Sequence, residues 1–187
     1  MSDQLKSIFF AAATAVICSL LLSGASVGLS GYKMRNIALD RQKNILLAAG
    51  LIHEDGSYLP ENIEKIFSEN IRTCKIDAAG RIISEKEGQP NQLPVSLYMK
   101  NGEVFAYIIP IDTQGLWGKI HGYLALEKDG STIIGFTVYK HSETPGLGGE
   151  IEKAWFSKNF KGKKIVDRTG NFVSISIARG KVSQGIS

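Results

Sequence analysis

The longest apolar stretch of this chain lies near its N-terminus, at residues 8–29, where no charged residue occurs between Lys6 and Lys33. A helix of this length can cross the roughly 30 Å hydrocarbon layer of a membrane, because it rises about 1.5 Å per residue. A cleaved signal peptide is the competing interpretation, since "SGASVG" is similar to a small-residue cleavage site. The length of the stretch favours a retained anchor, which we place at residues 1–34, with one transmembrane helix at about 8–29.

The next two segments have helical spacing. Residues 36–51 carry apolar positions at helical intervals and end at Gly50, which predicts a helix that continues out of the membrane. Residues 59–71 predict a second, short helix with Pro60 in its first turn and isoleucines on one face.

From Cys74 onward the period changes to that of β-strands. Residues 74–85 predict a strand, a turn and a strand, while 95–111 and 119–142 predict hairpins around Asn101-Gly102 and Asp129-Gly130. A helix at 150–162 and strands at 163–167 and 172–181 complete the pattern. The expected fold class is α+β: a membrane helix followed by a mainly antiparallel, twisted sheet with short flanking helices, in one domain at 35–187.

Composition excludes several functions. The net charge is +4, but Lys and Arg are spread along the whole of the 187 residues without a dense basic stripe, which argues against nucleic acid as a partner. Cys18 and Cys74 are expected to stay unpaired, and the chain has no CxxC motif. The three histidines lack metal-ligand spacing, no catalytic constellation is visible, and no GxGxxG or Walker A sequence is present.

Two glycine-bearing segments remain as candidate sites: "TQGLWGKIHGY" at 113–123 and "HSETPGLGGEIE" at 141–152. Glycine allows close approach of the backbone to a ligand, and Leu147 and Trp117 offer apolar surfaces to a flat ring. From the residues alone, a tight loop–helix connection with a core Leu and Trp is an equally good interpretation.

A family resemblance favours the ligand site. "KHSETPGLGGEIEKAWF" closely resembles the signature of the FMN-binding domain family, which includes the C subunits of sodium-translocating NADH:quinone oxidoreductases and the G subunit of the Rnf complex. "GLWGKIHGYLAL" and "ALDRQKNILLAAGL" also resemble the C subunits, so the resemblance covers nearly the whole chain. It implies a flavin-carrying electron-transfer subunit of a six-subunit membrane complex that oxidises NADH, reduces ubiquinone and exports sodium ions. The alternatives are an Rnf-type electron-transport subunit and a flavin-free binding or assembly module.

The resemblance also implies how the cofactor is held. The family carries FMN covalently, as a phosphoester on a Thr of an S-G-A-T motif, and a separate flavin transferase makes this bond. The residues that the resemblance places beside the flavin or in support of it are Trp117, Gly118, His141, Glu143, Thr144, Leu147, Gly148 and Gly149. No catalytic residue and no metal ligand are expected on this chain.

The attachment motif itself is missing. The chain ends "KVSQGIS", where the family commonly reads D-G-I-S-G-A-T, and Gln184 stands near the position of the expected Asp. We expect that the sequence is truncated at the Ser of this motif, before its Thr; a chance match of "GIS" is the alternative. Ser187 is not a candidate for the attachment residue.

Membrane orientation is the one point of conflict. Lys33, Arg35, Arg41 and Lys43 follow the apolar stretch, so the positive-inside rule taken alone places the C-terminal domain in the cytoplasm. The resemblance implies a bacterial inner-membrane protein with one span and a periplasmic domain. We follow the resemblance, because partner helices also set orientation in a complex.

Overall fold

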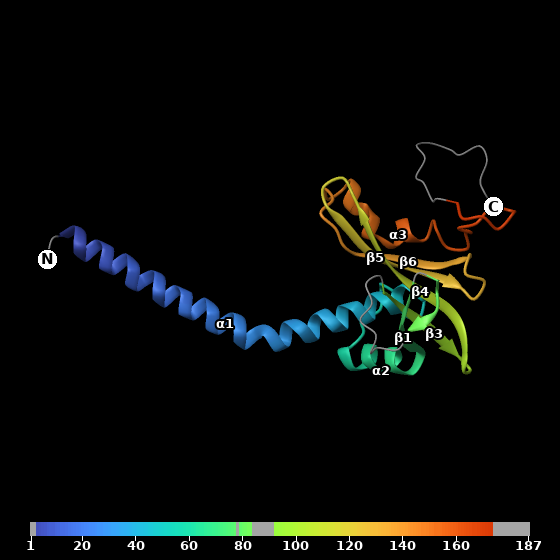
Figure 1. Ribbon diagram of the computed structural model, residues 1–187, viewed down its shortest axis with the longest axis horizontal. Helices are drawn as coiled ribbons and strands as arrows, with labels where there is room; N and C mark the ends of the chain where they lie inside the picture. The colour runs from blue at the N-terminus through green and yellow to red at the C-terminus, as the bar shows by residue number, and fades with distance from the viewer. Residues whose placement is uncertain (1–2, 78, 84–91, 174–187) are drawn as a thin grey trace. The chain divides into compact units, whose positions relative to one another are not determined.

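The computed structural model describes residues 3–77, 79–83 and 92–173, and it divides the chain into two compact units, Met1–Asp40 and Arg41–Ser187. The helices are α1 (Asp3–Ala48), α2 (Pro60–Asn70), the 3-10 helix η1 (Gly148–Glu152) and α3 (Ala154–Ser157). The strands are β1 (Ile71–Ile76), β2 (Ile82–Ile83), β3 (Leu93–Lys100), β4 (Glu103–Gln114), β5 (Lys119–Glu127) and β6 (Ile133–Lys140). Figure 1 labels most of these elements, coloured along the chain.

The first unit consists of the apolar part of α1. Within the described residues, α1 is the one helix that is long and apolar enough to cross a membrane, judged by length and composition. Its most apolar window has a mean hydropathy of 2.2, and none of that window is buried. The prediction that the apolar helix at 8–29 continues into the helix at 36–51 is confirmed, although α1 ends at Ala48. The predicted domain boundary at 34/35 stays a prediction.

The last turn of α1 belongs to the second unit and ends in a Schellman motif. The N–H of Leu51 donates to the carbonyl of Leu46 at 2.9 Å, and the N–H of Gly50 donates to that of Leu47 at 3.0 Å. Gly50 has φ +71°, a conformation that costs glycine little and other residues more. The glycine that was predicted to end this helix therefore does so, and the chain turns back onto the sheet.

The sheet has the order β2-β1-β3-β4-β5-β6, and every neighbouring pair is antiparallel. Both predicted hairpins are present. In the turn between β3 and β4, Asn101 and Gly102 have φ values of +53° and +82°, as a type I′ turn requires. The predicted mainly antiparallel α+β fold is confirmed.

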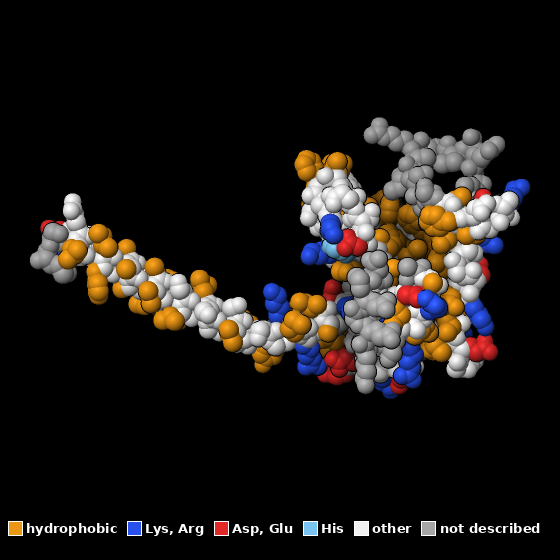
Figure 2. Space-filling view, in the orientation of Figure 1, with side chains coloured by type: hydrophobic (Ala, Val, Ile, Leu, Met, Phe, Trp, Pro, Cys, Tyr) orange, Lys and Arg blue, Asp and Glu red, His pale blue; other side chains and the backbone are white. Residues whose placement is uncertain are grey.

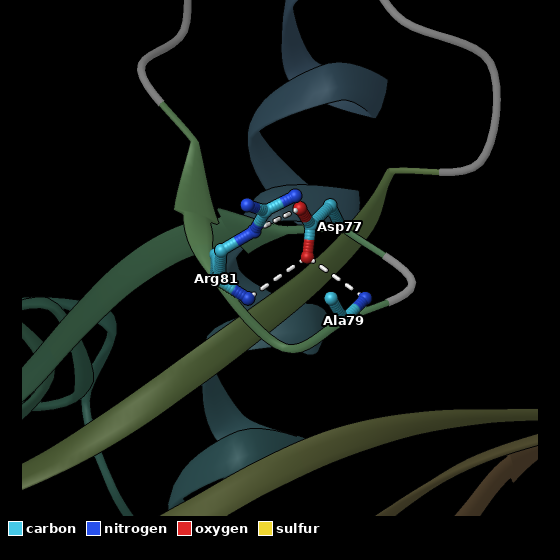
Figure 3. Close-up of polar contacts among 3 residues, drawn as sticks. All are labelled: Asp77, Ala79 and Arg81. Carbon is cyan, nitrogen blue, oxygen red and sulfur yellow. Dashed lines mark hydrogen bonds and ion pairs between the residues drawn. The ribbon is translucent and has the colours of Figure 1, made fainter.

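The turn between β1 and β2 is fixed by one carboxylate (Figure 3). Asp77 Oδ1 accepts hydrogen bonds from the N–H groups of Ala79 and Arg81, both at 2.9 Å, and Arg81 Nε donates to Asp77 Oδ2 at 2.9 Å. The bond from the Arg81 backbone is the main cause that lowers the pKa of Asp77, because it stabilises the charged form.

The hydrophobic core lies between one face of the sheet, the end of α1 and α2. Ile45 and Leu46 of α1 are almost completely buried, and they pack with Ile63 of α2 and with Ile108 and Tyr123 of the sheet. At β6 the helix lies so close that a Cβ on Gly135 would overlap the backbone carbonyl of Ala48. The apolar positions that predicted the second half of α1 are thus core positions.

The helix predicted at 150–162 is wrong in length. The chain forms the 3-10 helix η1, then an extended residue at Lys153 (φ −78°, ψ 144°), then the single turn of α3. Asn159 Nδ2 donates to the carbonyls of Trp155 and Phe156, at 3.0 and 3.2 Å, and so competes with the backbone bonds that would extend α3.

The two last predicted strands have different outcomes. Residues 163–167 form isolated bridges, Thr132 with Lys164 and Val166 with Phe172, in place of a regular strand. Asp167 explains the interruption, because it accepts bonds from Thr169 and Asn171 and closes a turn directly after Val166. Most of the strand predicted at 172–181, together with Gln184 and Ser187, lies outside the described residues.

Candidate functional site

The first glycine-bearing segment is the tight turn that joins β4 to β5. The N–H of Gly115 donates to the carbonyl of Gly118 at 2.7 Å, so Leu116 and Trp117 form the two-residue tip. Both tip side chains point into solvent, with exposed fractions of 80% for Leu116 and 68% for Trp117. The turn therefore presents an indole and an isobutyl group that the core does not use.

Glu143 connects this turn to the second segment. Its Oε1 accepts a hydrogen bond from the backbone N–H of Trp117 at 3.0 Å, across 26 positions of sequence. A Cβ on Gly115 would overlap the same carboxylate oxygen, and a Cβ on Gly118 would come within 2.9 Å of Ser142 Oγ. Glycine at both positions thus leaves room for the close approach of the two segments. We call residues 115–118 and 141–149, taken together, the Gly-rich site.

The second segment folds around the carbonyl of Thr144. This oxygen accepts from the N–H of Leu147 at 3.1 Å and from that of Gly149 at 2.9 Å. A Cβ on Gly148 would meet Glu143 Oε2 at 3.0 Å, and one on Gly149 would meet the Thr144 carbonyl at 3.1 Å. The turn therefore packs around Glu143 and holds Leu147 outward, 74% exposed.

His141 is held in one tautomer. The N–H of Glu143 donates to His141 Nδ1 at 3.1 Å, so Nδ1 is the acceptor and the ring proton lies on Nε2. Nε2 in turn donates to Glu152 Oε2 at 3.2 Å. The imidazole thereby connects the Glu143 backbone to Glu152 of η1 and positions Glu143.

Large apolar side chains lie exposed around this site. Besides Leu116, Trp117 and Leu147, Trp155 is 58% exposed, with its Nε1 donating to Glu150 Oε2 at 3.3 Å. Figure 2 shows hydrophobic side chains gathered at the tip of this part of the domain. A patch of this kind on a folded domain indicates a surface that contacts a ligand or partner.

The eight residues predicted for the site lie in these two segments: Trp117, Gly118, His141, Glu143, Thr144, Leu147, Gly148 and Gly149. The structure brings the two segments together through Glu143; the cofactor role of each residue stays a prediction. Sequence reasoning missed Gly115 and Glu152. Gly115 stands in the quoted motif, whereas nothing in the sequence pairs Glu152 with a histidine 11 positions earlier.

The fit to FMN rests on the arrangement of glycines and apolar groups. Gly115 and Gly118 lie where a Cβ would collide with the opposite segment, Gly148 and Gly149 lie where it would crowd their own segment, and Leu147 and Trp117 supply apolar surface for a flat ring. The pattern is that of a surface cradle. Two cavities of about 250 Å³ each lie elsewhere in the domain, and none of the eight residues lines either one.

Comparisons with known proteins agree with this geometry. A family model described as an FMN-binding domain matches residues 115–180, which include the whole Gly-rich site. The C subunit of the Na(+)-translocating NADH-quinone reductase of Neisseria meningitidis serogroup A is 31% identical, over 90% of this chain and 74% of the relative. The corresponding protein of Yersinia pestis is 29% identical, over 94% of this chain and 76% of the relative.

Solved structures agree as well. The C subunit from Parabacteroides distasonis has a TM-score of 0.70 at 28% identity, covering 83% of this chain and 80% of the other. The Shewanella oneidensis protein, at 24% identity and a TM-score of 0.68, shares the fold over 82% of this chain and 81% of its own. The chain therefore belongs to the family of C subunits of Na(+)-translocating NADH-quinone reductases.

Proposed function

We propose that this chain is the flavin-carrying electron-transfer subunit of a Na⁺-translocating NADH-quinone reductase, anchored in the membrane by α1. The relatives are named as C subunits of that reductase, and the matching family model is an FMN-binding domain. The chain contributes a cofactor site to the complex and performs no substrate chemistry alone.

The observation that carries the proposal is the Gly-rich site. Two segments far apart in sequence meet at Glu143, and both present large apolar side chains to solvent instead of to the core. The side chains of Leu147 and Trp117 contribute little to folding stability, because they remain in contact with water. Contact with a cofactor ring would explain why these apolar side chains are exposed.

Each group has a distinct task in this proposal. Leu147 and Trp117 contact the ring and exclude water from it, while the glycines let the backbone approach closely. Glu143 fixes the spacing of the two segments, and His141 fixes Glu143. When bound, FMN supplies one-electron transfer, which needs a rigid site and no acid or base from the protein.

Three finer features belong to the same proposal and rest on the family resemblance. The flavin is bound through a phosphoester that a flavin transferase makes; the required Thr is absent from the motif position within these 187 residues. The complex has six subunits. The domain that carries the Gly-rich site faces the periplasm of a bacterial inner membrane.

The experiment is complementation of a bacterium that lacks its own C subunit. Membranes that contain this chain are assayed for sodium-stimulated quinone reduction by NADH, with Leu147→Asp as the variant and Leu59→Asp as the matched control. Leu59 is also exposed, and it lies outside the Gly-rich site. We expect Leu147→Asp to lower the sodium-stimulated rate at least about tenfold, and Leu59→Asp to leave it within about twofold.

The amount of this chain in the purified complex separates function from assembly. Normal assembly with lost activity supports a cofactor site, whereas normal activity of Leu147→Asp would refute the assignment of Leu147. Assembly without any sodium-stimulated activity of the unaltered chain would refute the electron-transfer function itself.

A further inference from the structure

A cavity of about 250 Å³ lies on the face of the sheet that carries α1, apart from the Gly-rich site. It is lined by side chains from β3, β4, β5 and β6 and by one residue of α1: Arg41, Pro94, Ser96, Ile108, Pro110, Tyr123 and Tyr139. We call it the Arg41 cavity. The proposed electron-transfer function does not involve this cavity.

Sheet register explains why these side chains converge. Ser96 pairs directly with Ile108 and Pro110 with Tyr123, and strand alternation places Pro94 on the same face as Ser96. The rings of Tyr123 and Tyr139 stack with centroids 5.4 Å apart and planes inclined at 23°. The lining is therefore held by a regular sheet, not by mobile loops.

Two of the buried residues in the lining carry a hydroxyl group. Ser96 is 4% exposed and Tyr123 is 6% exposed. The Ser96 hydroxyl in the cavity wall can donate a hydrogen bond to a ligand or to water.

The charge of the cavity has one sign. Among the described residues that line the cavity, Arg41 is the charged one, and none is Asp or Glu. Burial is the main cause that raises the pKa of Tyr123, with Tyr139 adding to it and Arg41 acting in the opposite direction. At neutral pH the Tyr123 hydroxyl is thus protonated and can donate, beside a permanent guanidinium cation.

We propose that the Arg41 cavity binds a small organic carboxylate. The guanidinium of Arg41 receives the carboxylate, the hydroxyls of Ser96, Tyr123 and Tyr139 supply further donors, and Ile108 with the two prolines contacts the apolar body. The volume lies below the roughly 300–1,000 Å³ of sites for drug-sized ligands, so the ligand is smaller than a flavin nucleotide.

The test uses the full chain in an uncharged detergent, labelled with 3-fluorotyrosine and observed by fluorine NMR. Benzoate is the probe, inorganic phosphate tests a bare oxyanion, and benzylammonium has the same ring with the opposite charge. We expect benzoate to shift the Tyr123 and Tyr139 signals saturably, to bind more tightly than phosphate, and benzylammonium to cause no saturable shift.

Arg41→Met should weaken benzoate binding at least about tenfold, because a bond to a charged group is lost. Arg72→Met is the matched control; Arg72 lies on β1 outside the lining, and this variant should bind within twofold of the unaltered chain. Unchanged Tyr58 and Tyr98 signals report that each variant is folded. Ser96→Ala, which should weaken binding several-fold, provides a second test if Arg41→Met does not fold.

Non-saturable shifts, equal binding by Arg41→Met and the unaltered chain, or phosphate binding as tight as benzoate would each overturn the assignment.

Discussion

The backbone N–H of Trp117 donates to Glu143 Oε1 at 3.0 Å, and this bond joins the β4–β5 turn to the segment that follows β6. We predict that Glu143→Ala lowers the flavin content of the purified protein several-fold, because the two segments lose their common acceptor. The free energy of unfolding should fall by only about 1 kcal/mol, as for one ordinary hydrogen bond. Flavin absorbance per protein and thermal unfolding measure the two effects. Glu143→Gln keeps an acceptor oxygen and should retain more flavin; equal loss in both variants would contradict a bridging role.

A side chain at Gly115 should displace the Glu143 carboxylate. A Cβ there would overlap Glu143 Oε1 and lie 2.8 Å from Ile120 Cδ1. Gly115→Ala is therefore expected to displace the Glu143 carboxylate and to reduce flavin content as Glu143→Ala does. Gly31→Ala is the control, since nothing lies within 4 Å of a Cβ at that position of α1. Full flavin content in Gly115→Ala would show that the close approach is not required.

Gly135 tests the packing of α1 on the sheet. A Cβ there would overlap the carbonyl oxygen of Ala48 and lie 3.2 Å from its carbonyl carbon, and neither backbone atom can rotate away. We expect Gly135→Ala to lower the free energy of unfolding by about 1–3 kcal/mol. Chemical denaturation of the detergent-solubilised chain measures this. A change below about 0.5 kcal/mol would mean that the helix end is held loosely.

Removal of the exposed apolar side chains should separate stability from cofactor binding. Leu147 is 74% exposed, so Leu147→Asp should change the free energy of unfolding of the flavin-free protein by less than about 0.5 kcal/mol. The same variant should lose most of its flavin. Denaturation of flavin-free samples and flavin absorbance of the loaded ones provide the two readings. A large loss of stability would show that Leu147 is a core residue after all.

Acid should destabilise the turn between β5 and β6. Asp129 accepts a hydrogen bond from the hydroxyl of Thr132, which is the main cause that lowers its pKa, and it also accepts from the N–H groups of Thr132 and Ser131. A lowered folded-state pKa means that this stabilisation is present above the unfolded value of about 3.9 and is lost as the pH falls below it. Asp129→Asn should therefore lower Tm at pH 7, and the difference from the unaltered chain should narrow below about pH 4. A difference that stays constant with pH would exclude the carboxylate charge as its cause.

The sequence predicted the hairpins and the long helix because local signals decide them. Asn101, Gly102 and Gly50 adopt positive φ angles, which few other residue types favour. The apolar stretch of α1 is long enough to cross a membrane as a helix, which satisfies its own backbone hydrogen bonds. The prediction of one helix at 150–162 was wrong, although the apolar residues have helical spacing. Lys153 is extended, and the Asn159 side chain competes for the backbone carbonyls. Tertiary context overrode the local pattern there.

The candidate site was predicted only in part. The glycines, with Leu147 and Trp117 beside them, located the two segments, and the family resemblance joined them. The bond from Trp117 to Glu143 and the contact of His141 with Glu152 depend on sheet register and on the path of η1. Neither register nor path follows from residue spacing alone.

The central claim is that the Gly-rich site holds FMN, and the most direct measurement is the flavin content of the full-length protein purified from its native membranes. The samples are the unaltered chain, Leu147→Asp and the control Leu59→Asp, each compared by flavin absorbance per protein and by flavin fluorescence on a denaturing gel. The account predicts about one flavin per unaltered chain and a selective loss in Leu147→Asp, and the gel reports whether the flavin is covalently bound. A folded, unaltered protein without flavin, or one whose flavin content is indifferent to Leu147, would contradict it.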